Sequence, residues 1–412
     1  MKYVYFALVF TMWVIQPVAA KTQLFTSYSN QLDEKSVSSF SHISVHTKHL
    51  FSAATLDVDA LKRLQKGDAL LMNLPDEAVE SQVVNIVKGA SGSRHIILRS
   101  YVGGLPVSSV ITLGESAFRL ELVTSHGLLS GLGSEAGVVL SNPSEVFHAK
   151  GFTQDDFIVA SAIQNGKNTA LSQGVMSAQQ EHSAIDESLQ SNASQDDEAI
   201  MKAVSTETGE IAYIDVLFVY SNNVTDVIDD IHTTIDHFIA YTNQAFEDSG
   251  IFAKVRFKGS VAVDYDYANG SDALDDLSQG NPPFEEIDVH RYQFGADAVA
   301  LLTPNLTGDS SAGIAFQNGH IKYSGANSMY SQSDVDSSAS TFAHELGHNL
   351  GLGHSRPQGE TGSDFDYGVG YRIPIPDGVG FSTIMSYWIG NTSEVPYFSN
   401  PAKLCGELPC GV

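Results

Sequence analysis

The chain has 412 residues, of which 42% are hydrophobic and 17% charged, so it holds enough apolar material for a core, and wholesale disorder is excluded. Lys and Arg total 22 against 48 Asp and Glu, which gives a formal net charge of −26. This balance argues against nucleic acid or an anionic membrane surface as the main partner, because both are recognised through basic footprints.

Residues 1–20 have the pattern of an export signal. Lys2 precedes an apolar run at Tyr3–Ile15, and the small residues of Val18–Ala20 precede Lys21. A membrane anchor is the alternative, but a span needs about 20 apolar residues, and no Cys follows the cleavage point to carry a lipid. We therefore expect a signal peptide at 1–20 and a secreted protein.

The first unit, residues 21–171, is predicted to be a β-rich domain. Alternating β-branched residues over 94–123, interrupted by glycines, predict a run of antiparallel strands. Two blocks before that run, 56–64 and 77–87, are predicted to be helical.

Residues 172–208 differ in composition from what precedes them. They are rich in Ser, Gln, Asp and Glu and carry no sustained apolar stripe, which is typical of a mobile acidic linker. Such segments are cut easily by proteases. We expect cleavage between Asp196 and Glu210.

The second unit, residues 209–412, alternates strand and helix patterns. A buried strand is predicted at Ile211–Tyr220 and an amphipathic helix at Val224–Asp248, which Gly250 ends. Further strands are predicted at 252–263, 296–302, 312–316 and 326–330, and a helix at 337–352. This alternation predicts a layered α/β domain.

The segment TFAHELGHNLGLGH, residues 341–354, carries the chemistry. His344 and His348 are four residues apart, so on a helix they share one face and can bind one metal ion. Gly351 allows the helix to stop and the chain to turn. That turn brings His354 back as a third ligand, and Glu345 adjoins the first one.

Three imidazole ligands leave one position of a zinc ion open, as in catalytic rather than structural sites. Zinc lowers the pKa of a bound water and polarises a carbonyl group. Glu345 is predicted to accept the water proton and to pass it to the leaving amine. Surface histidines on an ordinary helix are the alternative, but they leave Gly351 and His354 unexplained.

Two residues downstream are candidates for supporting the metal. Met385, within TIMSY, would form an apolar floor beneath the histidines, as the Met-turn that follows this zinc signature does. Taken alone, Met385 is more often an ordinary core residue. The hydroxyl of Tyr387 could point at the zinc or at the oxyanion, or the side chain could simply be packed in the core.

With these motifs the region from Ile211 to Cys410 resembles the metzincin zinc metalloendopeptidases, and within them the bacterial peptidyl-Asp metallopeptidase and reprolysin-like group. The resemblance rests on IDVLFVY, TNQAFEDSGI, GADAVALL, AGIAF, TFAHELGHNLGLGH, TIMSY and YFSNP, in that order. The zinc and Met-turn motifs are the specific ones. The roles given above to the three histidines, Glu345, Met385 and Tyr387 carry over to the same positions.

The resemblance implies a fold and a mode of synthesis. The fold is an α/β (α+β) catalytic domain with a mixed, mostly parallel five-stranded sheet and an active-site helix, preceded by a β-rich propeptide domain. The edge strand near Ala312–Phe316 would bind the substrate backbone as an added strand. The protein would be a zymogen, inhibited by its own propeptide, that acts on protein or peptide substrates.

Three departures from that family pattern stand out. Ser355, rather than Asp, follows the third histidine, as in matrixins. Ser311 stands where relatives often have Cys. Residues 21–404 contain no Cys, so latency must use another zinc ligand or steric cover.

Other features are less specific. Cys405 and Cys410 are predicted to form one disulfide, with free thiols or a zinc site as alternatives. Family likeness suggests cleavage beside acidic residues, for which Arg372 and Lys322 are the candidate cations. Calcium is possible for a secreted protease, but no motif supports it: 264–276 is predicted to be a strand end running into a capped helix.

Two other functions compete with an active endopeptidase. One is a binding or adhesin-like protein that keeps the fold without hydrolysis; such proteins normally lose the Glu or a ligand His, and this chain keeps both. The other is a zinc hydrolase acting on a non-peptide bond. A monomer is the default expectation.

Overall fold

The computed structural model describes most of the chain outside the two segments expected to be removed or mobile. The described residues are 21–29, 32, 48–74, 77–102, 104–135, 137–150, 157–159, 210–266, 269–304, 311–317, 329–358, 363, 365–373, 380–387, 392–405 and 408–411. The expected signal peptide, the expected linker and Lys322 lie outside these residues. Below, the N-terminal region is residues 21–150 and the C-terminal region is residues 210–411.

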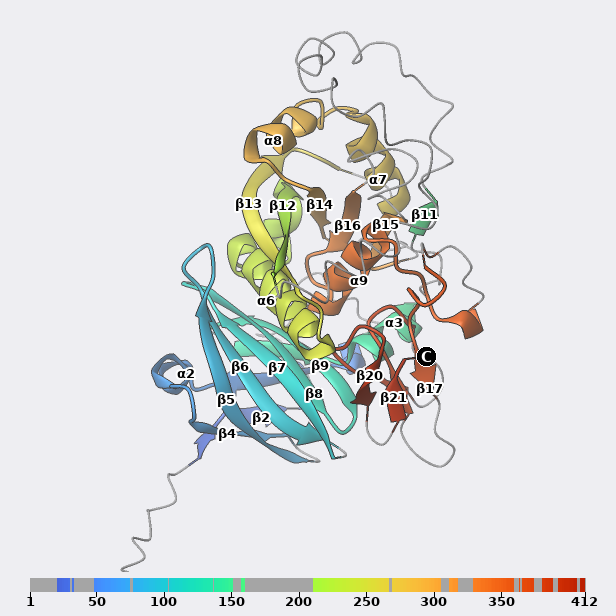
Figure 1. The fold of residues 1–412 in the computed structure, drawn as a ribbon. Helices are drawn as coiled ribbons and strands as arrows, with labels where there is room; N and C mark the ends of the chain where they lie inside the picture. Colours follow the sequence, from blue (N-terminus) through green and yellow to red (C-terminus); the bar gives the residue numbers. More distant parts are fainter. Residues whose placement is uncertain are drawn as a thin grey trace, which may run out of the picture.

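The N-terminal region is built on one ten-stranded sheet (Figure 1). In spatial order its strands are β1 (Thr22–Gln23), β4 (Ala69–Asn73), β5 (Ala78–Lys88), β6 (Arg94–Val102), β7 (Leu105–Leu113), β8 (Ala117–Thr124), β9 (Gly127–Ser134), β10 (Gly137–Ser141), β3 (Phe51–Leu56) and β2 (Phe25–Ser29). All neighbours pair antiparallel except β1 and β4. The run of antiparallel strands predicted over 94–123 is confirmed as β6, β7 and β8.

Of the two helices predicted in this region, one forms and one does not. Helix α2 (Val58–Arg63) begins after Asp57, whose carboxylate accepts a hydrogen bond from the backbone N–H of Ala60. The helix predicted at 77–87 is wrong, because those residues form strand β5. Its side chains alternate between buried and exposed from Ala78 onwards, and this period of two belongs to a strand with one face on the core. Two short helices complete the region: η1 (Lys48–Leu50) and α3 (Pro143–Lys150).

The C-terminal region is built on a six-stranded mixed sheet. In spatial order its strands are β11 (Phe157–Val159), β15 (Gly313–Gln317), β16 (Tyr330–Asp334), β14 (Ala298–Thr303), β12 (Ala212–Ser221) and β13 (Ala253–Val263). Only the β15–β16 pair is antiparallel. The sheet differs from the expected five-stranded one by β11, which precedes the C-terminal region in the chain and pairs with β15.

Helices cover both faces of this sheet. Long helix α6 (Ile231–Ser249) and the helix of the zinc motif, α9 (Ala339–Asn349), pack on one face against Val216, Phe218 and Ala300. The alternate residues of the same strands pack against α7 (Gly270–Gln279) and α8 (Ile287–Phe294) on the other face. The layered α/β arrangement predicted from strand and helix alternation is therefore present. Asn269 caps α7, as predicted, by accepting a hydrogen bond from Asp272 N at 2.9 Å.

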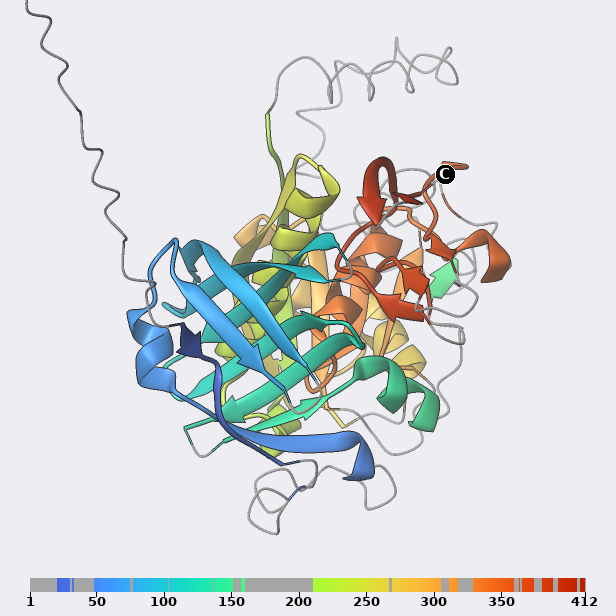
Figure 2. The same cartoon turned by 90° about the horizontal axis from the view of Figure 1, so that it is seen from below.

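Helix α6 lies between the two sheets, and both views show the strands of the N-terminal sheet running beside it (Figures 1 and 2). Ile97 of β6 and Val110 of β7 belong to the same hydrophobic core as Phe238 of α6. Neighbouring residues on those strands, such as Ile96 and Ile111, instead fill the separate core of the N-terminal region. One face of the N-terminal sheet thus shares a core with the C-terminal region.

The end of the chain adds two small sheets. β17 (Arg372–Ile373), β18 (Gly380–Ser382) and β19 (Thr392–Glu394) form one, and the hairpin β20 (Asn400–Cys405) and β21 (Leu408–Cys410) forms the other. Cys405 and Cys410 are disulfide-bonded across this hairpin. Among the described residues, two further short helices are η4 (Asn222–Asp226) and η6 (Arg356–Gln358). Among the described residues no helix combines the length and apolar character that a membrane crossing requires.

Candidate metal centre

Helix α9 presents the first two histidines. The side chain of Ser338 caps the helix by accepting a hydrogen bond from Ser340 N at 3.2 Å. At the other end Gly351 has φ +89°, a left-handed conformation that glycine adopts without a Cβ clash. The backbone N–H of Leu352 then donates to the carbonyl of Gly347 at 2.9 Å, which closes the helix and reverses the chain.

This reversal brings the third histidine to the other two. The Nε2 atoms of His344 and His348 are 3.0 Å apart, those of His344 and His354 3.1 Å, and those of His348 and His354 3.2 Å. All three side chains are buried, with exposed fractions of 7%, 0% and 4% in chain order. Three ring nitrogens therefore converge on one point, and among the described residues they form the one cluster of His, Cys, Asp or Glu suited to a metal.

The other ring nitrogens indicate the tautomer of two of these side chains. His344 Nδ1 lies 2.6 Å from the carbonyl oxygen of Ile384, and His348 Nδ1 lies 3.0 Å from that of Leu352. A carbonyl oxygen can only accept, so each Nδ1 carries the proton, and in a neutral ring Nε2 keeps a lone pair. The convergent nitrogens can thus act as metal ligands, and backbone acceptors orient their rings as they usually orient histidine ligands of zinc.

The spacing of the nitrogens fits zinc. Zn–N bonds of about 2.0–2.1 Å in a tetrahedral site separate ligand nitrogens by roughly 3.3 Å, close to the 3.0–3.2 Å between the three Nε2 atoms. Within the described part of the chain, the cluster consists of three nitrogen ligands, and three neutral nitrogens are the donor set of an open, catalytic zinc site. His344, His348 and His354 are therefore the residues that could hold the ion.

Met385 lies directly against the metal-binding helix. Its side chain is 2% exposed, and a Cβ built on Gly347 would stand 2.4 Å from its sulfur. On the far side, a Cβ built on Gly370 would stand 2.0 Å from the Met385 carbonyl oxygen. Met385 thus lies between Gly347 and Gly370, two positions where a side chain would clash with it. Gly347 belongs to the turn of α9 that joins His344 to His348.

Tyr387 lies beside the histidines. Its ring centroid is 4.8 Å from that of His354 and 5.7 Å from that of His344, and the side chain is 7% exposed. Its carbonyl oxygen accepts a hydrogen bond from Nη1 of Arg372 at 3.0 Å. The pKa of the Arg372 guanidinium is lowered by burial, so this cation is partly withdrawn from water next to the site.

Glu345 lies between helix α9 and strand β15. The side chain is 1% exposed, and a Cβ built on Gly313 of β15 would stand 2.6 Å from Glu345 Oε1. The glycine therefore makes room for the carboxylate at the edge of the sheet. This places the expected base of the reaction next to the strand expected to bind a substrate backbone.

Two polar residues that the sequence patterns did not single out tie the site together. Asn349, at the end of α9, donates from Nδ2 to the carbonyls of Phe316 and Tyr330, both at 2.9 Å, and so fixes the helix to β15 and β16. Gln358 Oε1 accepts from Ser386 Oγ at 3.2 Å and from Tyr387 N at 3.3 Å. Neither residue belongs to a motif with a ligand spacing, so no local pattern could have identified them.

Comparison with known proteins supports the metal centre. Residues 208–412 match the family model described as metallo-peptidase family M12B reprolysin-like. The Pseudomonas aeruginosa peptidyl-Asp metalloendopeptidase is 30% identical over 221 residues, covering 48% of this chain and 36% of that protein. The Stenotrophomonas maltophilia protein of the same name is 27% identical over 210 residues, covering 50% and 49%. The chain thus spans between about a third and a half of the length of these relatives.

Among solved structures, metalloproteinase-II from Bacteroides fragilis aligns over 83% of this chain and 91% of its own, with 11% identity and a TM-score of 0.47. An overlap at that level carries no argument about the site. The family match and the relatives confirm the resemblance inferred from the zinc and Met-turn motifs. Residues 208–412 are a metzincin-type zinc metallopeptidase domain of the reprolysin-like M12B family.

Proposed function

We propose that the protein is a secreted zinc endopeptidase, made as a latent precursor, that hydrolyses peptide bonds in other proteins. One observation carries the proposal: three buried histidine Nε2 atoms converge within 3.2 Å of one another, and the Glu345 carboxylate adjoins the first of them on the same helix. The family match supports the metallopeptidase chemistry. Secretion rests on the signal-peptide pattern of residues 1–20.

The proposed chemistry divides between the metal and the protein. When bound by the three histidines, zinc would supply Lewis acidity, polarising the scissile carbonyl and acidifying a water molecule. Glu345 takes the proton of the attacking water on its carboxylate and returns it to the amine that leaves. Its burial and its fixed place beside Gly313 favour this transfer, because a general base must lie within hydrogen-bond reach of the proton it removes.

Strand β15 is the proposed binding site for the substrate backbone. It lies next to Glu345 and pairs with β16 along one edge, and its other edge is occupied by β11 in the full chain. Once β11 leaves, that edge would offer its peptide groups to an incoming strand. Strand addition supplies backbone hydrogen bonds whatever the side chains are. This arrangement favours a peptide over a non-peptide substrate.

Latency is the second part of the proposal. In the full chain, strand β11 (Phe157–Val159) pairs with that outer edge of β15, with Phe157 opposite Ala315 and Val159 opposite Gln317. A segment preceding the C-terminal region thus covers the edge that a substrate would need. Because residues 21–404 hold no Cys, such steric cover is a sufficient alternative to a thiolate on the metal. Cleavage in the segment between Asp196 and Glu210 would separate the two parts.

Preference for acidic residues is proposed from the relatives and from one cation. The relatives are named peptidyl-Asp metalloendopeptidases, and Arg372 is hydrogen-bonded to the backbone of Tyr387 beside the histidines. A half-buried guanidinium there would pair with a substrate carboxylate. Lys322, the other candidate, lies outside the described residues.

A binding or adhesin-like function without hydrolysis is the competing proposal. It requires that an intact set of three histidines and Glu345 be kept without use. The non-hydrolytic reading is therefore weaker, and it is decided by experiment.

The test is cleavage of casein and of a mixed peptide library by the processed protein, with and without a zinc chelator. Glu345→Gln should lower the rate by about 10²–10⁴-fold while leaving the zinc content unchanged. Loss of activity under both treatments supports the mechanism. A folded, zinc-loaded and fully processed protein that cleaves nothing would favour the binding function instead.

A further inference from the structure

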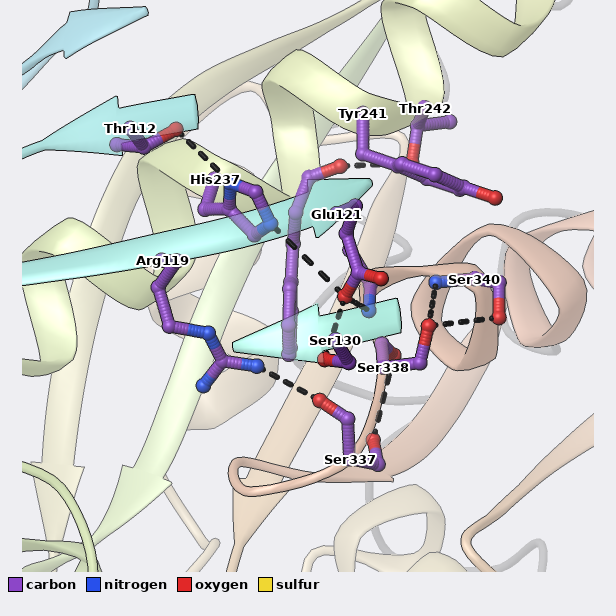
Figure 3. Close-up of polar contacts among 12 residues, drawn as sticks. Thr112, Arg119, Glu121, Ser130, His237, Tyr241, Thr242, Ser337, Ser338 and Ser340 are labelled. Carbon is purple, nitrogen blue, oxygen red and sulfur yellow. Dashed lines mark hydrogen bonds and ion pairs between the residues drawn. The ribbon is translucent and has the colours of Figure 1, made fainter. Parts of the chain in front are cut away.

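Two charged residues of the N-terminal region reach the start of the metal-binding helix. Arg119 of β8 donates from Nη1 to the carbonyl of Val335 at 2.6 Å and from Nη2 to that of Ser337 at 2.7 Å. Glu121, two residues along the same strand, accepts at Oε1 from the backbone N–H of Ala339 at 2.9 Å. Figure 3 shows both side chains pointing from β8 towards the turn that leads into α9.

These contacts match the groups that a helix start leaves without partners. The first N–H groups of a helix have no acceptor within the helix, and a carboxylate there is also favoured by the helix dipole. Glu121 satisfies the N–H of Ala339, the first residue of α9, while Ser338 satisfies that of Ser340. Arg119 donates to two carbonyl groups of the preceding turn, so strand β8 binds the backbone both before α9 and at its first residue. We call these contacts of Arg119 and Glu121 the bracket.

The bracket is buried and is part of a wider polar network. Arg119 is 1% exposed and Glu121 0%. Glu121 also accepts from Ser130 Oγ at 2.9 Å, and its Oε1 lies 4.0 Å from Nε2 of His237 in α6 (Figure 3). The guanidinium of Arg119 lies 5.3 Å from the ring centroid of Phe238, on the same helix. Buried polar groups are costly when their hydrogen bonds are broken, so the bonds of Arg119 and Glu121 to the backbone before α9 and at its first residue favour one position of β8 relative to α9.

We infer that Arg119 and Glu121 are positioning residues for the metal centre: the N-terminal region is a template that holds the first turn of the metal-binding helix in place. Helix α9 has only 11 residues, and its first turn must be ordered before His344 and His348 can share one face. Helix nucleation is unfavourable in short segments. The acceptor on Glu121 and the donors on Arg119 therefore stabilise the start of α9 directly. The inference concerns assembly of the site and holds whether or not the site cleaves peptides.

A second interdomain contact offers a matched control. Arg99 of β6 pairs with Asp248 near the C-terminal end of α6, with Nη2 to Oδ1 at 2.7 Å. It joins the same two regions through α6, away from the start of α9. Arg99→Gln therefore removes an interdomain ion pair without touching the bracket.

The experiment uses the full chain with Glu345→Gln, so that it stays intact, and measures hydrogen–deuterium exchange by mass spectrometry over residues 336–343. Glu121→Ala should speed exchange there by about tenfold or more, since a buried hydrogen bond to a charged group is lost. Glu121→Gln, which keeps an acceptor oxygen, should restore slow exchange. Arg99→Gln should leave residues 336–343 as they are in the parent chain.

The outcomes decide the inference without reference to activity. The bracket is supported if exchange over residues 336–343 is fast in Glu121→Ala and slow in both Glu121→Gln and Arg99→Gln. A folded Glu121→Ala chain with parental exchange over 336–343 overturns it. If that chain does not fold, Arg119→Lys decides, because Lys cannot reproduce the two-pronged contact: parental exchange in that variant also overturns the inference.

Discussion

The sulfur of Met385 lies against Gly347, in the turn of α9 between two metal-binding histidines. A Cβ on Gly347 would approach that sulfur to 2.4 Å, well inside the normal contact distance, so no side chain fits there while Met385 keeps its position. Met385 is in turn confined by Gly370, where a Cβ would stand 2.0 Å from the Met385 carbonyl oxygen. Met385 therefore packs closely against α9 at this turn.

Gly347→Ala should consequently disturb the metal centre. Overpacking of this kind costs about 1–3 kcal/mol of stability, and displaced support of the ligands should weaken zinc binding by about 10–100-fold. Thermal unfolding and competition with a chromophoric chelator measure the two effects. The double variant Gly347→Ala with Met385→Ala should recover part of the zinc affinity, because the space taken by the sulfur is then free. Normal zinc affinity in the single variant would show that Met385 does not support the ligands.

Gly313→Ala should separate catalysis from metal binding. The added Cβ would stand 2.6 Å from Glu345 Oε1, so the carboxylate must move while the histidines do not. A displacement of about 1 Å at a reacting group can lower the rate by about 10²-fold. We expect the zinc content and the unfolding temperature to stay near those of the parent protein while kcat on a peptide substrate falls. If zinc is lost together with activity, the strand supports the whole centre and not Glu345 alone.

The metal centre was predictable because its parts are local. His344, His348, Gly351 and His354 lie within one helix and the turn after it, so their spacing alone implies that the ring nitrogens meet. The helix predicted at 77–87 fails for the converse reason: its burial is set by pairing in the N-terminal sheet, and the side chains of β5 alternate with a period of two.

The contacts that hold the centre in place leave no local trace. Glu121 and the N–H of Ala339 are 218 residues apart in the chain, and Arg119 and Glu121 are two ordinary charges on a strand until the fold buries them. Asn349 meets β15 and β16 only because the sheet is assembled. Such long-range polar contacts depend on tertiary packing and follow no residue spacing, so they emerge only from the structure.

Glu121 should make the stability of the full chain depend on pH. Burial raises the pKa of its carboxyl from its usual range to about 7, and Oε2 has no hydrogen-bond partner within the described part of the chain. A raised folded-state pKa gives stability that is fully present below about pH 4.5 and is lost as the pH rises through 7. The parent chain should therefore lose stability relative to Glu121→Gln between pH 5 and pH 8, by up to about 3 kcal/mol.

Denaturant unfolding of both chains across that range measures the difference. Comparing the two cancels the contribution of buried groups away from Glu121, such as His95, whose pKa is lowered by burial and which acts in the opposite direction as the pH falls. Glu394, whose pKa burial also raises to about 7, stays in both chains. A difference that does not change with pH would mean that Glu121 keeps its charge throughout.

Arg372 should set the preference for acidic residues. Its Nη1 donates to the backbone carbonyl of Tyr387 at 3.0 Å, and the ring of that tyrosine lies beside His344 and His354. Arg372→Gln should lower kcat/KM for Asp-containing peptides by about tenfold, the scale of one hydrogen bond to a charged group, and should leave Leu-containing peptides unaffected. Arg372→Lys keeps the positive charge but not the paired N–H donors of the guanidinium, so it should retain part of the preference. Equal losses on both peptides would assign Arg372 to holding Tyr387, and the source of any acidic preference would then lie elsewhere on the substrate edge.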